Sequence, residues 1–267
     1  MRVRSSYAGK RVAVDAHDAP SGSAADESGA RELAGHALAG AVVDEGLTSL
    51  PAALQRICRA TTSSLSLAGA AVQVITGTSD PVVLGSSDSV SRRLGEIPFE
   101  VGEGPCLEAF AIARPVLVPD LLGGGQSRWP GYVSAIAGEG VGAVFALPLH
   151  VGAVRLGVLE AYGAAARSLS TLEVSVALVL AEIATACLID TPDGSASALL
   201  DDHGLMKAME RRVEIHQAQG MVTVDLGVGL AEALALMRAH AFSRDLPLLE
   251  LARLILAGER IALLGTD

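Results

Sequence analysis

Aromatic residues are scarce in this sequence and make up only 3% of its 267 residues. Its core must therefore be packed from alanine, valine, leucine and isoleucine, and it offers no aromatic platform on which bases could stack. The three cysteines, Cys58, Cys106 and Cys187, are far apart and form no Cys-x-x-Cys pair. This spacing excludes a disulfide framework and a cysteine zinc site, and it predicts a reduced, cytoplasmic protein.

Motifs of catalysis and metal binding are also missing. The six histidines have no metal-ligand spacing to cysteines or carboxylates, and neither a Gly-Lys-Ser/Thr sequence nor a nucleophile elbow is present. No apolar segment follows the basic N-terminus, so secretion is not expected. The most apolar run, 174–189, contains Glu182 and is expected to be too short for a membrane span. The sequence thus predicts no enzyme, no cofactor, no metal and no membrane association.

Basic residues are in the minority, and the net charge is −10. This balance argues against broad, sequence-independent binding of polyanions. The charge is uneven, since residues 1–202 hold 13 basic and 22 acidic residues, whereas residues 203–267 hold 7 and 8. The C-terminal part is close to neutral, so any nucleic-acid binding there must depend on a local patch.

Half of the residues are hydrophobic, which is enough for a core. Residues 1–46 include a Ser/Gly/Ala/Asp-rich stretch and are predicted to form a flexible leader. The pattern over 47–190 predicts a helix, a hairpin, a mixed segment, a helix opened by Pro105, three strands and a final helix. The final helix is expected over 171–189, because Ser170 and Glu173 form a capping box. This order predicts an α+β domain with a central antiparallel sheet and flanking helices.

Four short motifs lie within this domain. They are Gly102-Glu103-Gly104-Pro105-Cys106-Leu107-Glu108-Ala109-Phe110, Pro115-Val116-x-Val118-Pro119, Arg128-Trp129-Pro130 and Pro148-Leu149. Together these segments resemble the GAF domains, which sense small molecules or redox state and often dimerise through terminal helices. The resemblance implies a GAF-like sensor domain with a small-molecule ligand that it does not identify.

The helix expected over 171–189 is apolar on almost every face. Such a helix is buried on more than one side. Its second side could meet another copy in a homodimer, or it could be covered by the N-terminal helix of its own domain. Both arrangements remain open.

Residues 191–204 are predicted to be a linker, and residues 205–264 to be a small bundle of three amphipathic helices. The residues expected to face inward are Leu205, Met209, Val213 and Gln217 on the first helix, Leu230, Ala233, Leu234, Met237 and Ala241 on the second, and Leu248, Leu251, Ala252 and Ile255 on the third.

Three segments of this bundle have family-specific residues at the right spacing: Glu214-Ile215-His216-Gln217-Ala218-Gln219-Gly220-Met221-Val222, Ala233-Leu234-Ala235-Leu236-Met237-Arg238 and Leu248-Leu249-Glu250-Leu251-Ala252. They resemble the ANTAR domain, an RNA-binding module of bacterial antitermination regulators. The sequence departs from the family at Gln219, Leu234 and Met237, where Lys, Phe and Leu are usual. The resemblance implies a homodimer that binds a hairpin leader transcript and prevents a terminator from forming.

Four residues of the bundle are candidates for RNA contact. Arg238, Arg244 and Arg253 could bind phosphates, and the amide of Gln219 could pair with a loop base. Arg238 is expected to point outward into solvent. Because Gln219 removes the family's positive charge, weaker or differently specific RNA binding is one expectation.

Cys106 supports two alternatives. Its place in the first turn of a helix would suit a thiolate, as in GAF-type enzymes that reduce free methionine sulfoxide. Glu103 and Glu108 oppose ionisation, however, and Phe110 indicates an inward, apolar face, so core packing is the preferred interpretation. A ligand-binding dimerisation module without RNA binding is the remaining alternative.

Overall fold

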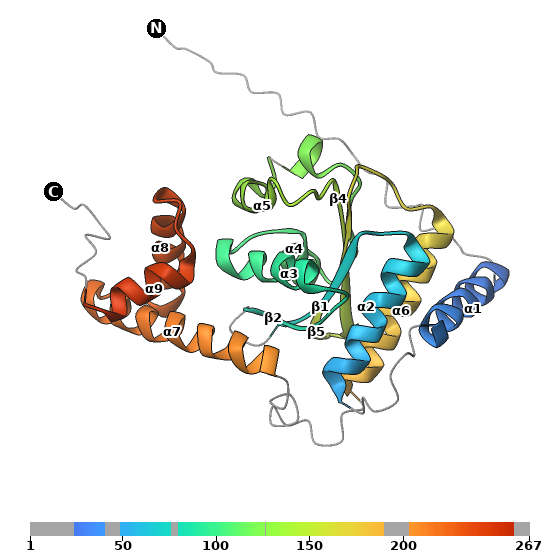
Figure 1. The fold of residues 1–267 in the computed structure, drawn as a ribbon, viewed down its shortest axis with the longest axis horizontal. Helices are drawn as coiled ribbons and strands as arrows, with labels where there is room; N and C mark the ends of the chain where they lie inside the picture. The colour runs from blue at the N-terminus through green and yellow to red at the C-terminus, as the bar shows by residue number, and fades with distance from the viewer. Residues whose placement is uncertain (1–23, 41–48, 76–79, 126, 190–202, 259–267) are drawn as a thin grey trace, which may run out of the picture.

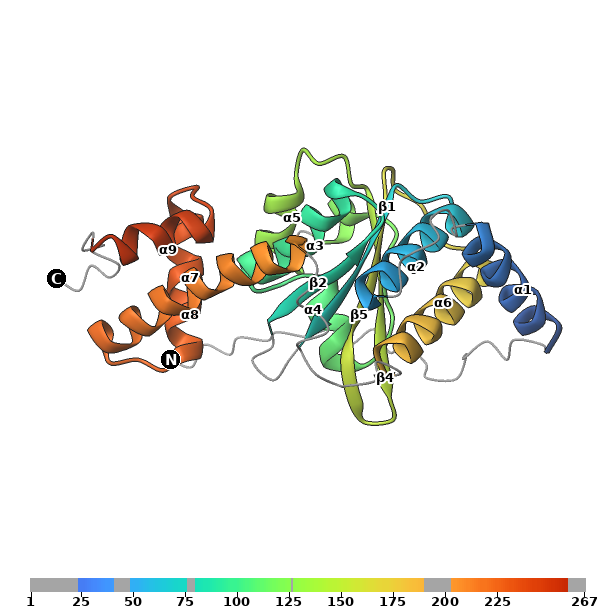
Figure 2. The same ribbon diagram turned by 60° about the horizontal axis from the view of Figure 1, so that its bottom comes forward.

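The computed structural model describes residues 24–40, 49–75, 80–125, 127–189 and 203–258. They form a sheet domain and a separate bundle of three helices beside it (Figures 1 and 2). The sheet is antiparallel throughout, in the order β2-β1-β5-β4-β3. Its strands are β1 (Gly69–Ile75), β2 (Pro81–Ser86), β3 (Val116–Val118), β4 (Ala143–Val151) and β5 (Val154–Gly163). The predicted α+β class with a central antiparallel sheet is confirmed.

Helices cover both faces of the sheet (Figure 2). On one face lie α2 (Leu50–Leu65) and α6 (Thr171–Ile189), with α1 (Ala24–Gly40) packed against them. On the other face lie α3 (Ser89–Val101), α4 (Pro105–Ile112), the short π-helix η1 (Leu121–Gly125) and α5 (Pro130–Ile136). Side chains along a strand alternate between the faces, so one sheet serves two cores.

Three helices, α1, α3 and α5, were not predicted, and α5 lies among the three expected strands. The segment expected to be a flexible leader contains α1, whose Ala30 and Ala34 are fully buried against α2 and α6. Small side chains allow this close packing but give little hydrophobic signal in the sequence. Helix α3 occupies the segment predicted only as mixed, because Gly95 and Pro98 inside it are poor helix formers. The side chain of Asp88 accepts from the Ser91 amide at 2.9 Å and caps its start.

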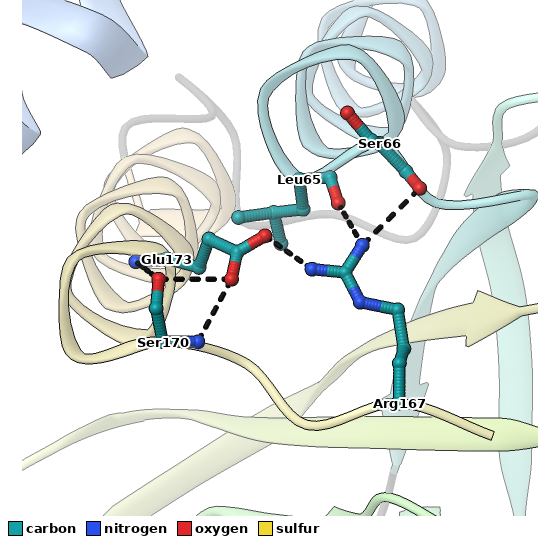
Figure 3. A network of polar contacts seen from close by, with 5 residues as sticks. All are labelled: Leu65, Ser66, Arg167, Ser170 and Glu173. Carbon is teal, nitrogen blue, oxygen red and sulfur yellow. Dashed lines mark hydrogen bonds and ion pairs between the residues drawn. The ribbon is translucent and has the colours of Figure 1, made fainter.

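The start of α6 is fixed by polar contacts, as predicted. The Ser170 amide donates to Glu173 Oε2 at 2.8 Å, and the Glu173 amide donates to Ser170 Oγ at 3.3 Å. Arg167 also pairs with Glu173 and donates to the carbonyl of Leu65 at 2.8 Å (Figure 3). The capping box therefore also ties the start of α6 to the end of α2.

Helix α6 is partly covered by its own domain. Val176 and Leu180 pack toward the sheet, and α1 and α2 lie alongside the helix, as in one of the two expected arrangements. Leu172, Leu178 and Ile189 remain exposed. The expectation that this run is too short for a membrane was wrong, since α6 has 19 residues and is long and apolar enough to cross a membrane by length and composition alone. Its buried face, from Val176 to Thr185, packs in the core and accounts for part of the apolar sequence.

The bundle consists of α7 (His203–Leu226), α8 (Leu230–Ser243) and α9 (Leu248–Leu256). All four residues predicted to face inward on α9 are buried, and so are four of the five on α8, Leu230 being exposed. The three-helix bundle predicted for the C-terminal part is confirmed.

The stripe predicted on α7 was wrong where the structure describes it. Val213 and Gln217 are exposed, whereas Ile215, Ala218 and Val222 are buried. The side chains of Leu205 and Met209, like most of the predicted linker at 191–204, lie outside the described residues. The buried face of α7 is therefore rotated from the predicted one and packs in the core of the bundle.

Candidate functional site

Arg238 does not point into solvent. Its Nε and Nη2 donate to the carbonyl oxygen of Phe99 on α3, at 3.0 and 2.7 Å. Its guanidinium lies 5.5 Å from the centroid of the Phe99 ring, and its Nη2 lies 3.6 Å from Asp80 Oδ1. Only 20% of the side chain is exposed. The expectation of an outward Arg238 is therefore wrong for this conformation, in which the residue joins the bundle to the sheet domain.

Phe99 is the residue of the sheet domain that packs into the bundle at this contact. Its ring is 4% exposed and packs in the buried core of the bundle, although it belongs to the sheet domain. The ring of His216 meets it edge to face, with centroids 6.5 Å apart, and His216 Nε2 lies 3.9 Å from Asp80 Oδ2. We call Asp80, Phe99, His216 and Arg238 the interdomain contact. Phe99 lies in the segment predicted only as mixed, so the sequence did not indicate this contact.

Gln219 is also turned inward. It is 7% exposed, its Nε2 donates to the carbonyl of Leu230 at 2.6 Å, and its Oε1 lies 2.9 Å from His216 Nδ1. Both ends of the amide are thus used, one within α7 and the other toward α8. In this conformation the amide is not available to a base, so the geometry does not support the expected role in base recognition.

The other two candidate arginines lie at the surface of the bundle. Arg244 caps the end of α8 through its backbone, and its side chain is exposed. Arg253 on α9 is 60% exposed and pairs with Glu214 of α7, with Nε 2.6 Å from Oε2. Exposed pairs of this kind contribute little to stability and exchange readily with other partners. The structure therefore leaves Arg244 and Arg253 accessible while it buries Arg238 and Gln219.

A cluster of polar side chains is buried on the α3–α5 face of the sheet. Gln73 Nε2 and the Tyr162 hydroxyl donate to Glu160 Oε2 at 2.8 and 2.9 Å. The Cys106 thiol donates to Gln73 Oε1 at 2.9 Å. Among the described residues, Glu160 Oε1 and the hydroxyl of the neighbouring Tyr132 make no hydrogen bond. We call these five residues the buried polar cluster.

Burial changes the acid–base behaviour of the buried polar cluster. Desolvation raises the pKa of Glu160 to about 7, while the hydrogen bonds from Tyr162 and Gln73, and the nearby backbone of Cys106, act in the opposite direction. Burial, and then the charge of Glu160, raise the pKa of the Cys106 thiol. A buried neutral thiol is a poor nucleophile. Cys106 therefore packs in the core, as preferred.

Little in the sequence indicated this cluster. Gln73 and Glu160 lie 87 residues apart, and only the pairing of β1 with β5 brings them together. The signal was Gln73 in the apolar run 70–75 and Glu160 in the apolar run 156–162. Among the described residues, no group of His, Cys, Asp and Glu is arranged to hold a metal ion.

A short segment lies between the buried polar cluster and the interdomain contact. Glu103 Oε1 accepts from the amides of Gly131 and Tyr132, at 2.5 and 3.2 Å, and so caps the start of α5. Gly104 (φ +139°) faces the Tyr132 ring, since a Cβ there would lie 2.8 Å from it. Gly102 (φ +77°) faces Arg238, since its Cβ would lie 3.0 Å from Nη1. This connecting segment, residues 102–104, touches both sites.

Comparisons with known proteins agree with this architecture. A model of the GAF domain matches residues 48–188, and a model of the ANTAR domain matches residues 203–256. Among curated proteins, none matches the chain.

Three solved structures are similar to the sheet domain. The GAF domain of a phosphoenolpyruvate-protein phosphotransferase from Coxiella burnetii is 14% identical with a TM-score of 0.49, over 61% of this chain and 94% of that one. The GAF domain of the Acinetobacter phosphotransferase is 12% identical with a TM-score of 0.46, over 60% and 92%. Free methionine-R-sulfoxide reductase from Neisseria meningitidis is 15% identical with a TM-score of 0.46, over 63% and 93%.

Each family model covers one structural unit: the GAF model matches the sheet domain, and the ANTAR model matches the bundle. The first ends within α6, and the second begins at the first residue of α7. The chain belongs to the GAF domain family and carries an ANTAR domain at its C-terminal end.

Proposed function

We propose that this chain is a signal-responsive antitermination regulator. Its ANTAR domain binds a hairpin leader in nascent RNA and prevents a terminator from forming, and its GAF domain controls that binding. The observation that carries the proposal is the direct contact between the two domains through Arg238 and Phe99. A sensor can shift an output equilibrium only if its states interact differently with the output domain, and this contact provides the interaction.

The buried polar cluster supports a small-molecule signal. Glu160 Oε1 and the Tyr132 hydroxyl are buried without a direct hydrogen bond among the described residues, and such atoms are costly in a protein interior. A small polar molecule that donates to Glu160 and pairs with Tyr132 would satisfy both. The α3–α5 face is therefore the site we propose for the ligand.

We further propose that the protein acts as a cytoplasmic homodimer. Large apolar side chains are exposed on the bundle, among them Val224, Leu230 and Phe242, and others are exposed along α6. Exposed apolar residues that cluster on a surface favour association. Sedimentation velocity across a range of concentrations tests the dimer, and a monomer at all concentrations would remove it.

RNA binding is tested with the full chain. RNA that co-purifies with the tagged protein is sequenced, and leaders with two consecutive hairpins should be enriched over a tag-only control. The protein should then increase readthrough of a terminator placed downstream of such a leader in a purified transcription reaction. Binding should weaken as salt rises, because phosphate contacts release counterions. If no RNA is enriched and readthrough does not change, the ligand-binding dimerisation module without RNA binding is the better interpretation.

A further inference from the structure

The residue that we expect to bind RNA is the residue that the sheet domain holds. We propose that the sheet domain and RNA compete for one face of the ANTAR bundle, so that the interdomain contact is an autoinhibitory latch. This inference rests on the proposed RNA-binding function of α8. It adds that the protein must separate Arg238 from Phe99 before it binds RNA tightly.

The donors of Arg238 show why the two partners exclude each other. A guanidinium binds a phosphate best along an edge that presents two parallel N–H groups. In this structure Nε and Nη2, which form one such edge, both donate to the carbonyl of Phe99. The Phe99 ring lies against the guanidinium, and Asp80 places a negative charge beside it. A phosphate cannot use that edge while the contact is closed, and Asp80 would repel it.

The contact also has features that allow it to open. Among the described residues, Phe99 is the one side chain of the sheet domain in the buried core of the bundle. The ion pairs around it are long, at 3.6 Å for Arg238 and 3.9 Å for His216, both to Asp80. The bundle has its own buried core of residues from α7, α8 and α9. Opening therefore requires the loss of one aromatic side chain, of a few polar contacts and of the contact between α7 and β2, not the unfolding of either domain.

The connecting segment gives the latch a route to the sensor site. Gly102 lies against Arg238, Gly104 lies against the Tyr132 ring, and Glu103 between them holds the start of α5. Protein interiors are close-packed, so a ligand that displaces the Tyr132 ring must also displace the backbone that touches it. Gly102 sits close enough to Arg238 that such a displacement reaches the latch.

The test uses full-length protein and two variants that weaken the latch by different means. Phe99→Ala removes the inserted ring, and Asp80→Asn removes the charge that faces Arg238 and His216. Asp225→Asn is the matched control, because it changes the net charge equally at an exposed position on α7. The probe is a fluorescent two-hairpin RNA selected from the co-purifying transcripts. Hydrogen exchange of α3 and α8, followed by mass spectrometry, reports whether the contact has opened.

Both latch variants should exchange faster at the end of α3 and should bind the RNA at least fivefold more tightly than the wild type. Asp225→Asn should do neither beyond a small effect of charge. Adding Arg238→Ala to Phe99→Ala should abolish the gain in affinity, because Arg238 is the shared residue.

Three results would overturn the inference. If exchange shows an open contact while the RNA affinity of the variants stays at the wild-type value, the latch does not inhibit, although the proposed function stands. If neither variant changes exchange or affinity, Phe99 and Asp80 do not hold the domains together. If the opened variants and the wild type all fail to bind RNA, the proposed function fails, and autoinhibition fails with it.

Discussion

The guanidinium of Arg238 donates from Nε and Nη2 to one acceptor, the carbonyl oxygen of Phe99. That carbonyl lies in the last turn of α3, where the helix has no further amide to satisfy it. A cation at a helix C-terminus also interacts favourably with the helix dipole. A residue of one domain thus caps a helix of the other, which couples the position of the bundle to the end of α3.

This relationship changes the expectation for Arg238→Ala. A solvent-facing arginine could be removed without cost, but hydrogen bonds that involve a charged group contribute about 1.5–3 kcal/mol each when buried. Because 20% of the side chain is still exposed, we expect a total loss of about 1–2 kcal/mol in the free energy of unfolding. Urea denaturation of the full chain measures it. Arg244→Ala, at the exposed end of the same helix, is the control and should cost less than about 0.5 kcal/mol. Equal stabilities of the two variants would show that the contact does not form in solution.

Much of the fold could be predicted from local sequence signals. The capping box of Ser170 and Glu173, the proline at the start of α4 and the inward residues of α9 all lie where the sequence placed them. Each of these signals depends on residues within one or two turns of a helix. The hairpin of β1 and β2 was equally local, since its strands are neighbours along the chain.

The elements that were missed depend on tertiary contacts. Helix α3 forms despite Gly95 and Pro98, because Leu94 and Phe99 pack on opposite sides of it, into the sheet domain and the bundle. Tertiary packing of this kind overrides weak helix propensity. The rotation of α7 had the same cause, since its core face is set by its neighbours.

The candidate site was harder to predict than the fold. The positions of Arg238 and Gln219 within helices followed from the sequence, but their surroundings did not. Phe99 is 139 residues from Arg238, and no periodicity relates the two. A polar residue in an amphipathic helix is expected to face solvent, so the sequence favoured the wrong environment for both.

Glu160 should make stability depend on pH. Folding raises its pKa from 4.5 to about 7, so the folded state holds this proton more tightly than the unfolded state. The contribution of Glu160 to the free energy of unfolding is at its full value below pH 4.5. It falls as the pH rises toward 7 and stays constant above that pH. The loss amounts to about 3 kcal/mol at most, at 1.36 kcal/mol per pKa unit.

Glu160→Gln removes this titration and keeps the shape of the side chain. The variant should therefore gain stability relative to the wild type between pH 5 and pH 8, by about 2–3 kcal/mol. Denaturant unfolding at several pH values gives the difference between the two proteins. Glu182→Gln, at an exposed position on α6, should follow the wild type at every pH. A difference that does not change with pH would mean that Glu160 titrates normally.

Cys106 should behave as a buried thiol. Its thiol is fully buried and donates a hydrogen bond to Gln73, and burial raises its pKa. In native protein, Cys106 should therefore react with iodoacetamide more slowly than the half-buried Cys187. Mass spectrometry of the labelled peptides ranks the two sites. Cys106→Ala should cost about 1–2 kcal/mol, from the small cavity and from the unpaired Gln73 oxygen. Fast labelling of Cys106, or turnover of methionine sulfoxide, would instead favour the thiol-enzyme alternative.

Gln219 should act on the stability of the bundle. Its amide bridges His216 and the carbonyl of Leu230, and it is almost fully buried. Gln219→Ala removes both contacts and leaves buried polar groups unpaired, which should cost about 1–3 kcal/mol. Gln217→Ala is the matched control, because it is the same change two residues earlier at an exposed position, where almost no loss is expected. Hydrogen exchange of α7 and α8 measures the effect locally. If Gln219→Ala leaves exchange unchanged but alters which RNA loops the protein selects, then Gln219 leaves the bundle interior on binding and contacts a base after all.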